Sequence, residues 1–312
     1  MRAIGYFTHG GPEVLQLVEV SEVHVGPGQV RLRVHAATVN PTDVSSRKGA
    51  FAEQQKADPP PYVPGMEVAG TIDEIGDGVP DRLRVGDAVM GIVVPRGSLG
   101  AYREQIVLDA RSVVRAPAGR TFAQAATLTM NGLTARQSLD LLQLSPGQVI
   151  AVTGAAGAYG GYVVQLAKAE GLTVIADASE QDEELVASLG ADIVVRRGDD
   201  VASQIRAHFA DGVDGVADGA VLNERAVPAV RDGGAFTSVR GFRGAEQRGV
   251  RFTTTLVRNY AHEWEKLDRL RQQVEAGAIT LRVAAVYPPH QVAEAHRRLE
   301  AGGTRGRLVI QF

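Results

Sequence analysis

The chain contains no cysteine. Disulfide bonds and thiol nucleophiles are therefore excluded, and the thiolates of most structural zinc sites are absent. No apolar run approaches the roughly 20 residues that a membrane-spanning helix needs, and a formal net charge of −3 creates no basic field for nucleic acid. The first residues, Met1 to Phe7, lack the charged, apolar and small-residue order of a signal peptide. These absences predict a cytoplasmic protein without membrane or nucleic-acid partners.

The remaining pattern indicates two domains, for which 312 residues are sufficient at about 100–200 residues each. Residues 1–118 contain short β-like runs such as V-R-L-R-V at 30–34, and predict a small β-barrel. Residues 119–277 alternate helical and apolar segments, as in a doubly wound parallel sheet. Residues 278–312 read as strand, helix and strand, and we expect them to rejoin the barrel. The predicted fold class is α/β.

Individual elements follow from periodicity and from turn residues. We expect strands at 148–152, 173–176, 193–195, 215–218, 234–239, 281–287 and 307–312, and helices at 121–142, 180–189, 201–209, 222–230, 264–275 and 291–302. The helix at 121–142 should be interrupted near Asn131-Gly132. Residues 85–94 should form a strand pair around a Gly-Asp turn, and residues 52–61 a loop.

Residues 148–177 are the most informative stretch because they form a βαβ pattern around a turn that is nearly free of side chains. In such a turn, backbone N–H groups and the positive helix end approach a pyrophosphate, which a Cβ would hold away. Ala155 occupies the first glycine place of G-x-G-x-x-G, and we expect Gly154 to supply the missing turn freedom. The predicted cofactor-binding residues of this turn are Gly154, Ala155, Ala156, Gly157, Ala158, Tyr159 and Gly160.

Asp177 ends the second strand of this unit, about 20 residues after the turn, where an acid receives the hydroxyls of an adenosine ribose. Strand context, glycine spacing and the terminal acid together predict a dinucleotide site. A tight βα turn that binds no ligand is the alternative.

Five short motifs are spread along the chain. They are N-P-T-D at 40–43, P-x-V-P-G-x-E-x-A-G at 61–70, V-G-D-x-V-x-G at 85–91, G-L-T-A at 132–135 and G-A-A-G-x-x-G at 154–160. Together they resemble the motifs of the medium-chain dehydrogenase/reductase superfamily, and within it the zinc-free quinone oxidoreductase branch. The resemblance covers essentially the whole chain and implies a GroES-like barrel domain (1–118 and 278–312) and a Rossmann dinucleotide-binding domain (119–277).

Zinc alcohol dehydrogenases of that superfamily bind a catalytic metal through a cysteine, a histidine and a second cysteine. Asn40, Met66 and Met130 stand at those positions here, and none supplies the thiolate or imidazole that zinc prefers. No metal ligand is predicted. The resemblance therefore implies hydride transfer from NAD(P)H to a quinone or an α,β-unsaturated carbonyl.

The resemblance also suggests catalytic residues. Asn40 matches a family asparagine near the nicotinamide, and a turn-forming role before proline is the alternative. Thr134 matches a threonine that faces the cofactor, with a helix-packing hydroxyl as the alternative. Phe51 lies where many relatives have tyrosine, so Tyr62 or Tyr159 is the candidate phenolic donor. Tyr159 replaces a usual valine, and either covers the cofactor or packs under the helix.

The cofactor preference rests on opposing signals. The branch usually takes NADPH through a serine and basic residues, for which Ser179 and either Arg196 or Arg197 are available. Asp177 and the acidic run at 182–184 oppose a 2′-phosphate and favour NAD(H). We expect NADP(H), with NAD(H) as the alternative. Val239 and Arg240 map to a segment that the family uses near the nicotinamide.

Other functions stay open. An enoyl reductase of a biosynthetic pathway would use the same fold, as would a non-catalytic NAD(P)H-binding sensor. The resemblance further implies a homodimer formed through an edge strand of the nucleotide domain, near 234–240 and the segment that follows.

Overall fold

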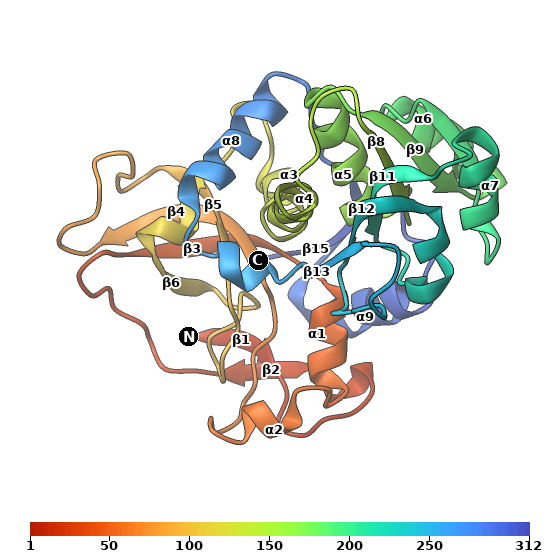
Figure 1. Ribbon diagram of the computed structural model, residues 1–312. Coiled ribbons are helices and arrows are strands. Elements are labelled where there is room, and N and C mark those ends of the chain that lie inside the picture. Colours follow the sequence, from red (N-terminus) through yellow and green to blue (C-terminus); the bar gives the residue numbers. More distant parts are fainter. The chain divides into compact units, whose positions relative to one another are not determined.

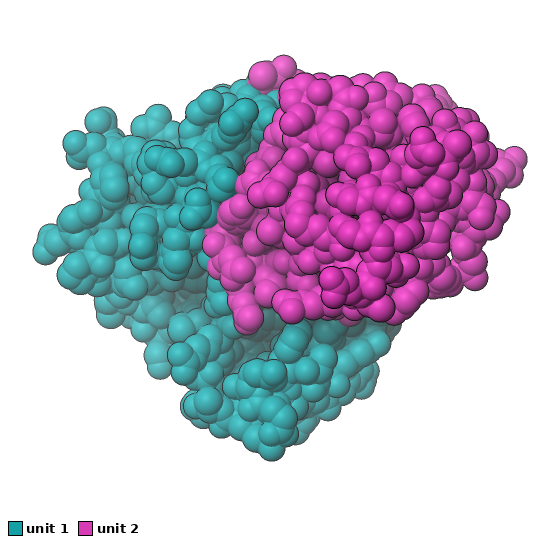
Figure 2. All heavy atoms as spheres, in the orientation of Figure 1, with its two compact units in different colours: residues 1–130, 261–275, 280–312 teal, residues 131–260, 276–279 magenta.

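The computed structural model describes residues 1–312, and the chain divides into two compact units (Figure 2). Unit 1 contains Met1–Met130, Ala261–Glu275 and Thr280–Phe312, and unit 2 contains Asn131–Tyr260 and Ala276–Ile279. No helix combines the length and the apolar character that crossing a membrane requires.

Unit 1 is built on a seven-stranded sheet in which β14-β15-β3-β4-β5-β7 are neighbours and β6 also pairs with β3 (Figure 1). All pairings are antiparallel except the parallel pair of β14 and β15. Its strands, with the separate hairpin of β1 and β2, are β1 Arg2–Gly5, β2 Gln16–Glu19, β3 Gln29–Thr38, β4 Glu67–Ile75, β5 Ala88–Ile92, β6 Gln105–Asp109, β7 Val113–Arg115, β14 Val283–Tyr287 and β15 Arg307–Gln311. Its helices are α1 Pro41–Arg47, α2 Ala52–Gln55, α3 Phe122–Ala125, α8 Trp264–Glu275 and α9 Val292–Glu300.

The predicted alternation of β3 is confirmed. Val30, Leu32 and Val34 are buried in the core of unit 1, whereas Arg33 on the opposite face is exposed. A period of two places alternate side chains on opposite faces of a strand, so one face of β3 lines the apolar core. The same strand pairs with β4, β6 and β15, which makes it the centre of the barrel-like unit.

Helix α8 belongs to unit 1, although the predicted boundary placed residues 264–275 in the nucleotide domain. The helix contacts β7 and buries Leu267, Leu270 and Val274. The carboxylate of Glu275 also accepts a hydrogen bond from the backbone N–H of Ala118 at 2.8 Å. Residues 119–130 likewise lie in unit 1, because α3 contacts β3, β4, β14 and β15.

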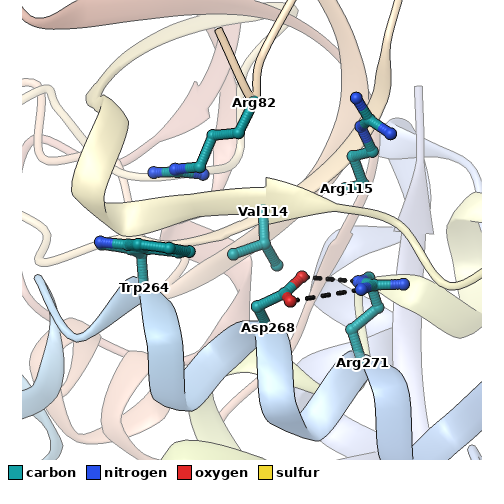
Figure 3. Close-up of a pocket in the computed structure, with 6 residues that line it drawn as sticks. All are labelled: Arg82, Val114, Arg115, Trp264, Asp268 and Arg271. Atoms are coloured by element: carbon teal, nitrogen blue, oxygen red, sulfur yellow. Dashed lines mark hydrogen bonds and ion pairs between the residues drawn. The ribbon is translucent and has the colours of Figure 1, made fainter. Parts of the chain in front are cut away.

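A cation–π pair fixes the start of α8. The guanidinium of Arg82 lies 4.4 Å from the ring centroid of Trp264 (Figure 3) and donates to the carbonyl oxygen of Val113 at 2.7 Å. About two turns further along the helix, Arg271 donates to Asp268 at 2.6 Å. The small pocket between these side chains has a volume of about 250 Å³. Its cations are engaged by backbone carbonyls and neighbouring carboxylates, so the pocket has a structural role in attaching α8 to β7.

Unit 2 contains a six-stranded parallel sheet in the order β10-β9-β8-β11-β12-β13. The strand order runs outward from β8 in both directions, through β9 to β10 on one side and through β11 and β12 to β13 on the other, as expected for a doubly wound fold. The strands are β8 Val149–Thr153, β9 Thr173–Ala178, β10 Ile193–Arg196, β11 Val213–Asp218, β12 Val230–Ser238 and β13 Arg251–Thr254. Its helices are α5 Ala158–Ala169, α6 Glu183–Ser188 and α7 Val201–His208, and α4 Thr129–Leu142 enters it from unit 1.

Two predictions for unit 2 are wrong. The expected helix at 222–230 is replaced by two short 3-10 turns, at Asn223–Arg225 and Val227–Ala229. Pro228 lacks the N–H of a helix, and Val221 and Asn223 have φ angles of 58° and 54°, which a right-handed helix does not allow. The strand at 234–239 is also not at the edge of the sheet, because β13 pairs with it on the outside.

Three local predictions, two in unit 1 and one in the helical region 121–142, also need correction. Residues 85–94 form one strand, β5, preceded by a turn in which Gly86 has a φ of +91°. The loop expected at 52–61 begins with the short helix α2. The break in the helical region 121–142 falls at 126–128 between α3 and α4, so Gly132 lies inside α4.

Candidate functional site

The predicted cofactor residues of unit 2 gather at the carboxyl edge of the parallel sheet. Thr153 ends β8 and pairs in register with Asp218, which ends β11. Asp177 lies beside Val195 near the ends of β9 and β10. In doubly wound sheets this edge, on either side of the point where the strand order reverses, is where ligands bind.

The glycine turn between β8 and α5 has the backbone that its sequence predicts. Gly154 has a φ of +67°, which confirms that it supplies the turn freedom that Ala155, fully buried, does not. A Cβ on Gly160 would lie 2.4 Å from the carbonyl oxygen of Gly154, so only glycine fits there. Gly157 is the N-cap of α5, and the helix begins at Ala158. The turn therefore brings a helix N-terminus, with its partial positive charge, to the sheet edge.

Asp177 is buried under this turn, with 5% of its surface exposed. Its carboxylate accepts the backbone N–H of Ala155 at 3.2 Å. Burial raises the pKa of Asp177, and hydrogen bonds from the N–H groups of Ala155 and Gly154 and the charge of Arg197 oppose that rise. The carboxylate thus braces the turn in addition to standing at the predicted ribose position.

The polar residues that follow β9 are tied to one another. The hydroxyl of Ser179 donates to the carboxylate of Asp182. Arg196 lies 3.5 Å from Glu180 and 3.9 Å from Glu183. The serine and the arginine that the sequence suggested for a 2′-phosphate are therefore engaged with local carboxylates.

The remaining predicted residues of unit 2 lie on α4, α5 and the loop after β12. Thr134 is buried in α4, with 8% exposed. Tyr159 is also buried, and its ring is so close to Gly219 that a Cβ there would lie 2.7 Å from it, in agreement with the packing alternative. Val239 is half-buried and Arg240 is exposed, just beyond the end of β12.

Unit 1 contains a buried charged cluster around Asn40, whose side chain is completely enclosed. Arg307 of β15 donates to the amide oxygen of Asn40 at 2.6 Å and to the hydroxyl of Thr38 at 2.7 Å. The amide nitrogen of Asn40 donates to Glu67 at 3.2 Å. Both ends of the amide are therefore engaged within unit 1.

Glu67 is the acceptor at the centre of this cluster and is 0% exposed. One carboxylate oxygen forms the ion pair with Arg307, and the other accepts the backbone N–H at the start of α4. Its five donors are Arg307, Thr38, Asn40, Thr129 and Met130. A buried ion pair is stabilised when additional hydrogen bonds satisfy its remaining lone pairs and protons, and these donors satisfy the carboxylate of Glu67, whereas Nε of Arg307 has no hydrogen-bond partner.

A second buried carboxylate, Asp43, joins two loops of unit 1. It accepts the backbone N–H of Asn40 at 2.9 Å and of Gly65 at 3.0 Å, and the hydroxyl of Tyr102 donates to it at 3.3 Å. Burial raises the pKa of Asp43 to about 6, against the effect of these hydrogen bonds and of Arg307.

Tyr62 lies apart from the charged cluster in a group of rings. It stacks on His9 with 5.9 Å between ring centroids and 14° between ring planes. Its hydroxyl donates to the carbonyl oxygen of Gln55 at 3.4 Å. The phenol is half-buried and makes only this backbone hydrogen bond among the contacts described.

Comparison with known proteins agrees with this architecture. Residues 26–118 match the family described as Alcohol dehydrogenase GroES-like domain, and residues 189–310 the family described as Zinc-binding dehydrogenase. The chain is 31% identical to the NADPH-dependent alkenal/one oxidoreductase, chloroplastic, of Arabidopsis thaliana, over 99% of this chain and 79% of that protein. It is 30% identical to the quinone oxidoreductase of Mus musculus, over 99% and 97% of the two chains. The chain belongs to the zinc-free quinone oxidoreductase branch of the medium-chain dehydrogenase/reductase superfamily.

A solved structure supports the same fold for this member of the branch. A mycobacterial protein complexed with NADPH superposes with a TM-score of 0.86 at 26% identity, over 100% of both chains. The fold is therefore a GroES-like domain and a Rossmann domain, as the sequence predicted. The mycobacterial protein is described in complex with NADPH, and the turn of this chain, with Gly160 free of a side chain, fits a nicotinamide dinucleotide.

Zinc does not fit this member, although one matched family is described as zinc-binding. The thioethers of Met66 and Met130 and the amide of Asn40 stand at the three ligand positions, and zinc prefers thiolate or imidazole there. In addition, the guanidinium of Arg307 lies 2.6 Å from the amide oxygen of Asn40, where its charge would repel a divalent cation.

Arg307 is the residue of this cluster that the sequence analysis missed. The sequence offered a way to find it, because Arg307 directly precedes the apolar run Leu308–Ile310, which is buried on both faces of the strand. A charged residue in such a strand requires a buried partner. The sequence does not identify the partner, which lies 240 residues away at Glu67.

Proposed function

We propose that this chain is a zinc-independent, NAD(P)H-dependent oxidoreductase that transfers hydride to a quinone or an α,β-unsaturated carbonyl. The observation that carries the proposal is the glycine turn, where only glycine fits at 160 and the N-terminus of the 12-residue helix α5 meets the sheet edge. Relatives named for quinone and for alkenal/one reduction support the acceptor class.

The protein's part in such a reaction is binding and orientation. A bound reduced nicotinamide supplies the hydride. The turn and the start of α5 would hold the pyrophosphate, with Asp177 fixing the shape of the turn. From the family resemblance, Thr134 is proposed to face the nicotinamide and Tyr62 to lie on the acceptor side. Asn40 is instead proposed to support the wall of the barrel, because its amide is engaged by Arg307 and Glu67.

Oxidation of NADPH and NADH against a panel of quinones, enals and enones tests the proposal. The expected result is oxidation that requires an acceptor and no added metal, unchanged by a chelator. Turnover of thioester-linked enones alone would instead indicate an enoyl reductase. Tight cofactor binding without oxidation of any acceptor would contradict the proposal and favour a sensor.

For the donor we propose NADPH over NADH, with Arg197 as the residue that contacts the 2′-phosphate. Arg196 pairs with Glu180 and Glu183, whereas the exposed Arg197 forms no ion pair within contact distance and lies close enough to Asp177 to influence its pKa. The Arabidopsis relative is named as NADPH-dependent and the mycobacterial structure holds NADPH, which supports the same preference.

The neighbouring arginines form a matched pair for testing this preference. Arg197→Ala should weaken NADPH binding by roughly 10- to 100-fold, the usual effect of losing a hydrogen bond to a charged group, and leave NADH binding unchanged. Arg196→Ala is the control, with little effect on either. A wild-type protein that prefers NADH, or equal effects of Arg197→Ala on both cofactors, would contradict the assignment.

A homodimer and a cytoplasmic location also belong to the proposal. Strand β13 is an edge of the unit 2 sheet, so it is the proposed contact in place of the strand at 234–240. Analytical ultracentrifugation of the purified chain tests the dimer, and cell fractionation tests the location.

A further inference from the structure

Tyr159 occupies the first turn of α5, next to the glycine turn. Its ring packs on Gly219, after β11, where a Cβ would lie 2.7 Å from Cδ1 of the tyrosine. Its hydroxyl is 2.8 Å from the hydroxyl of Ser138 on α4. Burial raises the pKa of Tyr159, so the phenol stays protonated and retains its hydrogen-bond donor.

The hydroxyl of Ser138 is the centre of a buried chain of hydroxyl groups. The hydroxyl of Ser138 donates to the backbone carbonyl of Thr134 at 3.0 Å, and it lies 2.8 Å from the hydroxyls of Tyr159 and Thr255. The hydroxyl of Thr255 is in turn 3.0 Å from that of Thr237 on β12. The four hydroxyl groups thus form one connected network, an arrangement in which neighbouring hydrogen bonds polarise and strengthen one another.

We propose that Tyr159 and Ser138 are positioning residues for the nicotinamide cofactor, because their hydroxyl groups connect the glycine turn to the part of α4 that carries Thr134. The inference rests on the proposed function, in which the turn holds the pyrophosphate and Thr134 faces the nicotinamide. A change in the position of one end of the cofactor site is then transmitted to the other. Thr134, Ser138, Tyr159 and Thr237 all belong to unit 2.

Packing alone does not require this network of hydroxyl groups. A phenylalanine ring would fill the same space against Gly219, and a buried phenolic hydroxyl is destabilising unless it finds a partner. The partner here is the serine one turn after Thr134, which also bonds to the hydroxyl of Thr255, beyond the end of β13. Four hydroxyl groups from separate segments are thus linked to one another, and Ser138 links them to the backbone carbonyl of Thr134.

The test compares Tyr159→Phe with Tyr260→Phe. The hydroxyl of Tyr260, which lies outside the glycine turn, donates to Asp140 on α4 at 2.8 Å. The control therefore also removes a tyrosine hydroxyl that bonds to α4. Measurements are the dissociation constants of NADPH and NADH by fluorescence, the thermal midpoint, and the single-turnover rate of hydride transfer with its deuterium isotope effect.

We expect Tyr159→Phe to weaken binding of both cofactors by roughly 3- to 10-fold, as for one lost hydrogen bond, and to slow hydride transfer. Tyr260→Phe should lower the thermal midpoint comparably and leave both functional measurements unchanged. Ser138→Ala, measured in the same way, should reproduce the effect of Tyr159→Phe and replaces it if that variant does not fold. If Tyr159→Phe or Ser138→Ala keeps the cofactor affinity and the hydride-transfer rate of the wild-type protein, the inference is overturned while the proposed function stands. Failure of the wild-type protein to bind either cofactor would refute the proposed function itself.

Discussion

Removing the guanidinium of Arg307 should strongly destabilise unit 1. In Arg307→Met the side chain keeps a similar length, but Glu67 remains fully buried without its counter-ion, and the oxygens of Asn40 and Thr38 each lose a donor. Breaking one partner of a buried ion pair costs about 3–5 kcal/mol of unfolding free energy. The pair itself contributes less than this, because most of the loss comes from the unpaired charge left behind.

Urea unfolding followed by tryptophan fluorescence measures this loss. The chain has one tryptophan, Trp264, and it lies in unit 1, so its signal reports on the affected unit. Arg2→Met is the control, because Arg2 pairs with Glu104 at the exposed surface of the same unit. The control should shift the urea midpoint little, since exposed ion pairs contribute little to stability.

A double-mutant cycle decides whether the loss of stability comes from the ion pair of Glu67 with Arg307. Glu67→Gln alone should also destabilise, because it leaves Arg307 unpaired. The double variant Arg307→Met with Glu67→Gln removes both charges and should cost less than the sum of the single variants, by roughly 1–3 kcal/mol. Additive single effects, or an Arg307→Met protein within about 1 kcal/mol of wild type, would refute the reasoning.

Three further predictions concern other sites. Gly160→Ala should abolish NADPH binding measured by fluorescence, because its Cβ would lie 2.4 Å from the oxygen of Gly154, whereas Gly157→Ala, with 3.1 Å to the same oxygen, should bind more weakly but detectably. Asp43 has a folded pKa of about 6, above the usual unfolded value of about 3.9, so its contribution to stability is fully present below the unfolded value and is lost as pH rises through about 6. The stability of the wild type relative to Asp43→Asn should therefore fall between pH 4 and pH 7 in thermal unfolding, and a difference independent of pH would contradict the assignment. Leu270→Ala should destabilise unit 1 by about 2–5 kcal/mol, as for other fully buried leucines, and an unaltered urea midpoint would show that α8 does not contribute to its core.

Elements with a strong local pattern were predictable from the sequence. Helix 264–275 has the predicted ends because its apolar residues repeat on one face and become the buried Leu267, Leu270 and Val274. The glycine turn was predictable because close backbone approach leaves only one residue type at Gly160. In both cases the local sequence and the final environment agree.

The features that were not predicted, or were predicted wrongly, depend on interactions that local sequence does not encode. Strand β13 has four residues, none of them fully buried, so the alternation that identifies a strand is absent at this sheet edge. The apolar run at 222–230 resembled a helix, but Pro228 and the positive φ of Asn223 prevent one. For Asn40, the motif identified the position, whereas the orientation of its amide depends on Arg307, far away in the chain.

The ion pair of Glu67 with Arg307 also constrains the order in which the chain acquires its structure during synthesis. The ribosome completes all of residues 131–260, the body of unit 2, before Arg307 is made, so the Rossmann sheet can form while the barrel is still incomplete. Until β15 arrives, Glu67 has no cation to accompany it into the core, and closing the barrel early would bury a bare charge. The nascent barrel should therefore remain open and accessible to chaperones until β15 emerges. Pausing translation between residues 260 and 307 should prolong its sensitivity to proteolysis.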